Sequence, residues 1–98
     1  MSRVIWKYTI PVDDQFTLEL PAGAEVLSLQ VQNEVPCLWA LVDKTQKVHK
    51  RCFRGYGTGN PVVDELHKYI GTCMLGNGRF VYHVFEVFPI SADAFARA

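Results

Sequence analysis

Short runs of alternating apolar and polar residues, separated by proline, glycine, asparagine or aspartate, recur along the chain. In the run 15–20, for example, Phe16, Leu18 and Leu20 alternate with polar residues. Because successive side chains of a β-strand point to opposite faces, this period of two predicts strands with one buried face. The predicted strands are 3–10, 15–20, 25–32, 35–43, 46–56, 69–75 and 79–88.

Two of the connections between these runs are predicted to be tight turns. Gly76-Asn77-Gly78 favours a hairpin because its residues adopt positive φ at little cost, and Asn33-Glu34 is short enough to make a tight connection. About seven short strands in 98 residues predict a mostly β, antiparallel fold, either a small sandwich or a partly open barrel. We expect a single domain over residues 1–98, with 88–98 as a C-terminal tail.

The runs 35–43 and 79–88 are apolar at nearly every position. A strand that is apolar on both faces is usually covered on both, so we expect these two strands to be central. The side chains expected to be largely buried are Trp39, Leu41, Val84 and Phe85. Because the chain offers few helices to cover a second apolar face, we also expect a homodimer or larger homo-oligomer.

One or two short helices are predicted beside the strands. In the segment 60–68, Asn60 is a good capping residue, Pro61 suits the first helical position, and acidic residues follow in the first turn. A second short helix is predicted over 91–98, within the C-terminal tail, with Ser91 as its cap.

Composition and charge exclude several classes of protein. The chain is 49% apolar and 12% aromatic, which excludes intrinsic disorder, and its formal net charge of zero provides no global attraction to nucleic acid or anionic membranes. No run approaches the ~20 apolar residues of a membrane-spanning helix, and residues 1–7 do not resemble a signal peptide. The 3 cysteines have no short paired spacing, so reduced thiols and a cytoplasmic location are expected.

One stretch combines cations, aromatic residues and glycines. Basic residues interleaved with aromatic ones on a strand can meet phosphates and stack bases, and glycines before a helix start can turn N–H groups toward an anion. The candidate ligand-binding residues are Lys50, Arg51, Arg54, Tyr56, Gly57, Thr58, Gly59 and Asn60. The alternative is that the glycines serve turn geometry and the lysines protect a strand edge from aggregation. The stretch contains neither a P-loop nor a dinucleotide-binding fingerprint.

No catalytic residue, metal site or cofactor is predicted. His49 and Cys52 are three residues apart on a predicted strand, as are His83 and Glu86, so the members of each pair face opposite sides. None of the serines lies in a recognisable nucleophile elbow. The chain is therefore interpreted as a non-enzymatic protein.

A longer pattern extends over most of the chain. Its segments are Leu20–Gln32, Leu38–Asp43, Phe53–Pro61, Tyr69–Thr72 and Phe80–Glu86. In this order and spacing, residues 4–88 resemble a family of small, uncharacterised proteins encoded in phage and prophage genomes. The resemblance implies a phage accessory protein of the bacterial cytoplasm, and it brings no activity, cofactor or catalytic residue.

Three functional hypotheses remain open. The first is a module that binds a host or phage protein, as small phage proteins that inhibit host machinery do. The second is a binder of a phosphate-bearing ligand, a nucleotide or single-stranded nucleic acid, through the basic strand and the glycine turn, which predicts salt-sensitive binding. The third is a minor structural component of a virion.

Overall fold

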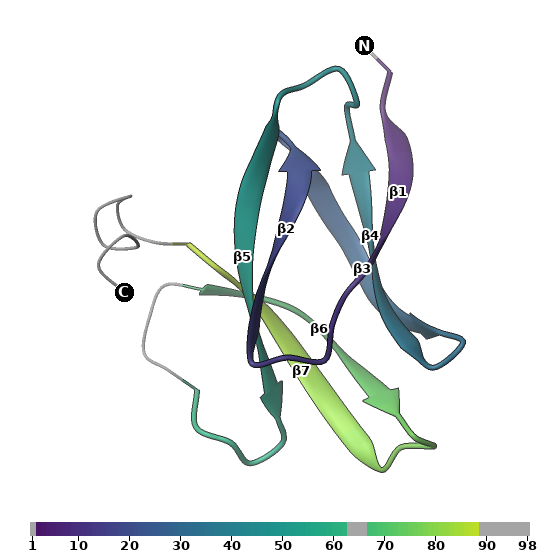
Figure 1. The fold of residues 1–98 in the computed structure, drawn as a ribbon, viewed down its shortest axis with the longest axis vertical. Coiled ribbons are helices and arrows are strands. Elements are labelled where there is room, and N and C mark those ends of the chain that lie inside the picture. The colour runs from purple at the N-terminus through teal and green to yellow at the C-terminus, as the bar shows by residue number, and fades with distance from the viewer. Residues whose placement is uncertain (1, 63–66, 89–98) are drawn as a thin grey trace.

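The computed structural model describes residues 2–62 and 67–88, and within these ranges the regular structure is entirely β. The strands are β1 (Val4–Thr9), β2 (Gln15–Pro21), β3 (Glu25–Gln32), β4 (Val35–Val42), β5 (Val48–Gly57), β6 (His67–Leu75) and β7 (Phe80–Val87). They form two antiparallel sheets, which we name sheet A (order β1-β4-β3) and sheet B (order β2-β5-β7-β6) (Figure 1). The part of the chain that the structure describes has no helix long and apolar enough to cross a membrane.

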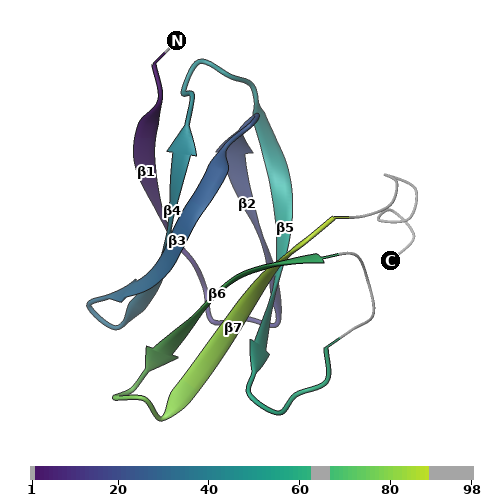
Figure 2. The same ribbon diagram turned by 180° about the vertical axis from the view of Figure 1, so that it is seen from behind.

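The two sheets pack against each other as a sandwich and do not close into a barrel. Strands β3 and β6 come from different sheets and lie against each other, as the view from behind shows (Figure 2). A Cβ atom on Gly71 of β6 would stand 3.1 Å from the Cβ of Leu29 on β3. The missing side chain of Gly71 therefore lets the two sheets approach at this corner.

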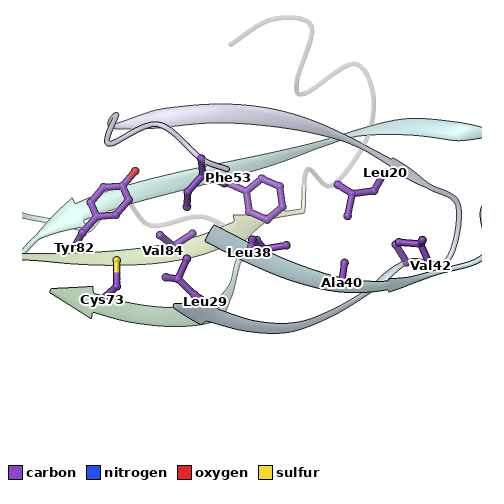
Figure 3. Close-up of a cluster of buried hydrophobic side chains, with 11 residues drawn as sticks. Leu20, Leu29, Leu38, Ala40, Val42, Phe53, Cys73, Tyr82 and Val84 are labelled. Atoms are coloured by element: carbon purple, nitrogen blue, oxygen red, sulfur yellow. The ribbon is translucent and has the colours of Figure 1, made fainter. Parts of the chain in front are cut away.

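Inward side chains from both sheets form one hydrophobic core (Figure 3). Its buried members are Ile10, Leu20, Ala24, Leu29, Leu38, Ala40, Val42, Phe53, Cys73, Tyr82 and Val84. Phe53 is the largest side chain that is fully buried, and its ring stacks on that of Phe16 with 5.2 Å between centroids. Aromatic stacking of this kind adds roughly 0.5–1.5 kcal/mol to the gain from burial.

The predicted strands, both turns and the antiparallel sandwich are confirmed. Asn33 and Glu34 have φ angles of 52° and 64°, as a two-residue hairpin between β3 and β4 requires. Gly76, Asn77 and Gly78 also have positive φ and connect β6 to β7. Local turn chemistry therefore determined both hairpins.

The helix predicted over 60–68 is wrong. Residues 67 and 68 belong to β6, and 60–62 are irregular. The Asn60 N–H donates to the Gly57 carbonyl at 3.1 Å, and Gly59 has a φ of 90°, so Asn60 closes a β-turn and does not cap a helix. Residues 63–66 and the second predicted helix, 91–98, lie outside the described residues.

The predicted burial is confirmed in full for Val84, whereas Trp39, Leu41 and Phe85 keep some exposure and are not members of the core between the sheets. Val84 has no exposed surface, whereas the other three are only partly buried and point away from the core. In β4 the inward positions are Leu38, Ala40 and Val42. Both central strands are apolar on two faces, but the opposite sheet covers only one of them. The outer face of each sheet therefore carries apolar side chains.

Candidate binding face on sheet B

The outer face of sheet B gathers most of the predicted ligand-binding residues. Phe53 of β5 is fully buried, so the alternate residues of this strand point outward. These outward residues are Lys50, Cys52, Arg54 and Tyr56. Strand β7 pairs with β5 and places His83 opposite Tyr56 and Phe85 opposite Arg54. We name this outer surface the sheet B face.

An aromatic cluster occupies the centre of the sheet B face. The ring of Phe85 lies 5.7 Å from Tyr56 and 5.4 Å from Tyr69, in edge-to-face geometry, and 4.8 Å from the imidazole of His67. The ring of Tyr69 is directly opposite Phe85 in the register, and this residue is 54% exposed. Mutual edge contacts hold these rings in place, so the cluster forms an ordered apolar platform.

A chain of hydroxyl groups and one imidazole crosses the same face. His83 Nε2 lies 2.8 Å from Thr58 Oγ1, and His83 Nδ1 lies 2.9 Å from Thr72 Oγ1. The Tyr69 hydroxyl in turn hydrogen-bonds to Thr72 Oγ1. Because hydroxyl groups donate and accept, both tautomers of His83 are satisfied in this position. The chain links the glycine turn to strands β6 and β7.

A hollow of about 200 Å³ lies between the glycine turn and the aromatic cluster. Its walls include all of 56–60, together with Tyr69, His83 and Phe85. Five of the eight predicted residues, Tyr56, Gly57, Thr58, Gly59 and Asn60, therefore line one hollow. Tyr69, His83 and Phe85 were missed, because the sequence does not reveal which strands neighbour β5.

A second hollow of about 360 Å³ lies further along β5. Its outward-facing walls come from Gln15, Thr17, Cys52, Arg54 and Val87. Burial raises the pKa of the Cys52 thiol, which is one of three free cysteines, so the thiol stays protonated near neutral pH. Arg54 lines this hollow and Tyr56 lines the first, so the two hollows follow one another along the same strand.

Two of the predicted basic residues contribute little charge to the sheet B face. Arg51 points inward, and its Nε and Nη2 donate to the two carboxylate oxygens of Glu86 at 2.5 and 2.7 Å. Its Nη1 donates to the carbonyl of Ala24 at 2.6 Å, so the guanidinium of Arg51 is engaged within the protein and faces away from the sheet B face. Lys50 is exposed on the face but stands directly opposite Glu19, which offsets its charge.

The anion site at the glycine turn stays a prediction, and one of the features it was based on, a helix beginning at residues 60–62, is absent. The described residues contain no helix start beside the turn, and the Asn60 N–H already has the Gly57 carbonyl as its acceptor. Among residues 2–62 and 67–88, no three histidine, cysteine or acidic side chains gather as metal ligands. The remaining chemistry of the face is aromatic and apolar, with hydroxyl groups and Arg54 at its edges.

A protein family described as a domain of unknown function (DUF7352) matches residues 1–92. The chain belongs to this family. No curated protein and no solved structure matches the chain. The DUF7352 match spans every strand of both sheets, so the aromatic cluster and both hollows lie within the family's domain.

Proposed function

We propose that this protein is a non-enzymatic binding module that binds an extended segment of another protein on the sheet B face. The observation that carries the proposal is an aromatic cluster beside two successive hollows, on a face whose charge is low. Buried aromatic and apolar anchors provide most of the binding energy at protein interfaces, and charged residues are depleted from the centre of such interfaces.

The arrangement of the hollows favours an extended segment. Arg54 and Tyr56 are two residues apart on β5, which corresponds to a spacing of about 6.6 Å. Alternate side chains of an extended peptide have the same spacing, so two of them would enter successive hollows. Thr58 and Thr72, with His83, would then supply hydrogen-bonding groups at the rim of the first hollow.

The resemblance of residues 4–88 to phage-encoded proteins supports a host or phage protein as the partner. Binding would then take place in the bacterial cytoplasm, and a small protein without catalytic residues would act by occupying a surface that its partner needs. Inhibition of a host enzyme is the functional consequence that this mode of binding favours.

Single-stranded nucleic acid is the second candidate ligand. Arg54 lies beside Phe85 and Tyr56, and Tyr69 is exposed enough to stack on a base. The neutral pairing of Lys50 with Glu19 weighs against it, because nucleic-acid binding depends on cations that neutralise phosphates. The two candidates differ in salt dependence, which is steep for nucleic acid and shallow for an apolar protein interface.

Selection of short random peptides displayed against the immobilised protein tests the proposal. We expect enriched peptides with apolar or aromatic residues at alternate positions. Tyr69→Ala should weaken binding of a synthetic version about 10- to 100-fold, because aromatic interface anchors contribute about 1.4–3 kcal/mol. Ile5→Ala, which removes an exposed apolar side chain from sheet A, is the matched control and should leave the affinity unchanged.

The alternative outcomes are distinct. Failure to enrich any peptide, or equal binding by wild type and Tyr69→Ala, would contradict a protein-binding role for this face. Binding of single-stranded oligo(dT) that falls steeply with salt and is lost in Arg54→Ala would instead support the nucleic-acid candidate. Melting temperatures of all variants, measured in parallel, separate loss of binding from loss of folding.

A further inference from the structure

The first hollow on the sheet B face, beside the glycine turn, has three aromatic walls. Phe85 of β7 stands in the middle, with Tyr56 of β5 on one side and Tyr69 of β6 on the other. The two tyrosine rings are inclined to the Phe85 ring by 79° and 62°. The three rings therefore do not stack into one flat layer, and π-electron density borders the hollow on three sides.

The remaining walls of the first hollow carry no fixed charge. Among the described residues, its lining contains no lysine, arginine, aspartate or glutamate. Arg54 is two residues from Tyr56 but lines the second hollow. Thr58 and Asn60 add a hydroxyl group and a side-chain amide. Because the face of an aromatic ring is the negative part of its quadrupole, walls of rings and neutral dipoles attract a cation, and no positive charge fixed in the lining opposes it.

The size of the first hollow suits the end of one side chain. Its volume of about 200 Å³ is below the roughly 300–1,000 Å³ of pockets that enclose whole small molecules. An apolar side chain would displace water from the Thr58 hydroxyl and the Asn60 amide without replacing its hydrogen bonds. An ammonium group has three N–H donors, so it can replace them.

We propose that the first hollow binds the ammonium end of a lysine side chain from the bound segment. The inference rests on the proposed function, because it names the side chain that the segment presents to the first hollow, two residues from an apolar anchor in the second. A cation within about 6 Å of a ring centroid is attracted to the ring, and most strongly where water is excluded. Three rings around one hollow let a single ammonium group contact more than one of them.

Choline and 3,3-dimethylbutanol test the proposal, because the two molecules have the same shape and the alcohol has a carbon atom in place of the charged nitrogen. We expect choline to bind the full chain about 3- to 30-fold more tightly than the alcohol. Both titrations are followed by two-dimensional NMR at about pH 8, where histidine side chains are normally neutral. Shifts confined to residues 56–60 and to the facing positions of β6 and β7 would place the probe in the first hollow.

Substitutions of Tyr69 separate the effect of the ring from that of apolar bulk. Tyr69→Leu keeps an apolar side chain but removes the ring, so choline should lose most of its advantage over the alcohol. Tyr69→Phe keeps the ring and should retain the advantage to within about threefold. Trp6→Leu is the matched control, because it removes an exposed aromatic ring from sheet A and should leave both affinities unchanged. Melting temperatures measured in parallel identify any variant that fails to fold.

The outcomes for the cation and for the protein partner are separate. Equal binding of the two probes, or a choline advantage that persists in Tyr69→Leu, would overturn the lysine inference and leave the proposed function standing with an apolar anchor in the first hollow. Failure to enrich any displayed peptide while choline keeps its advantage would instead contradict the proposed function. Enriched peptides with a lysine two residues from an apolar residue would support both. Replacing that lysine with norleucine should then weaken binding about 3- to 30-fold.

Discussion

Replacing Glu86 with alanine should destabilise the fold by about 3 kcal/mol, because it leaves the guanidinium of Arg51 largely buried without its partner. Glu86 is 3% exposed and accepts two hydrogen bonds from Arg51, whose own side chain is 24% exposed. The remaining exposure of Arg51 puts the expected cost at the low end of the range for broken buried pairs. A guanidinium stays charged in proteins even without a partner, so Arg51 cannot relieve the loss by deprotonation.

Urea unfolding of the variant and of wild type measures this loss. Glu19→Ala is the matched control, since Glu19 is an exposed glutamate opposite a lysine and should change stability by less than about 1 kcal/mol. The double variant Arg51→Met/Glu86→Leu should regain most of the loss, because it removes both buried charges and keeps the volume. A Glu86→Ala variant as stable as the control would show that the ion pair is not a structural element.

The strands were predictable because their signal is local. Alternation in 15–20 reports directly that one face is buried, and Asn33-Glu34 and Gly76-Asn77-Gly78 select hairpins through their own backbone preferences. The helix over 60–68 failed because Asn60-Pro61 is equally suited to a turn followed by an extended segment. The end of this segment forms a strand and not a helix, because His67 pairs with Val87 of β7.

The sequence does not show which face of a strand points to the core when both of its faces are apolar. Trp39 and Leu38 are both large and apolar, so composition does not reveal which of them faces the other sheet. The answer depends on how strands distant in sequence pair, because a shift of one residue moves every side chain to the opposite face. A β-bulge at Leu27, where the register of β3 against β4 shifts, has the same effect within one strand, and nothing local in 25–32 signals it.

Five of the eight predicted ligand-binding residues came together because they are contiguous, from Tyr56 to Asn60. Arg51 faces inward because side chains alternate along β5, where the even-numbered positions face outward. Tyr69 and Phe85 could have been found only with the register of β6, β7 and β5. The aromatic cluster is thus a product of tertiary pairing, which the sequence does not specify locally.

Replacing Gly55 with alanine should destabilise the fold by about 4 kcal/mol. A Cβ atom on Gly55 would overlap the ring and hydroxyl of Tyr82, which crosses over this position from the neighbouring strand β7. Overpacking a core costs about 1–3 kcal/mol, and displacing Tyr82 would also cost about 1 kcal/mol for each hydrogen bond lost. The Tyr82 hydroxyl donates to the Asp13 carbonyl at 2.6 Å and accepts from the Asp13 N–H at 3.2 Å.

These hydrogen bonds hold the segment that carries the chain from sheet A to sheet B, where the Gly55 N–H also donates to the Asp14 carbonyl at 3.0 Å.

Thermal and urea unfolding of Gly55→Ala, Tyr82→Leu and the double variant test whether the new Cβ acts by displacing Tyr82. Because both single changes act on the same contact, the double variant should lose clearly less stability than the sum of the two. Gly57→Ala is the control, since the nearest atom to its new Cβ is the end of the Asn60 side chain at 3.1 Å, which can move aside. Strict additivity, or a Gly55→Ala variant no less stable than Gly57→Ala, would mean that Tyr82 does not require a glycine beneath it.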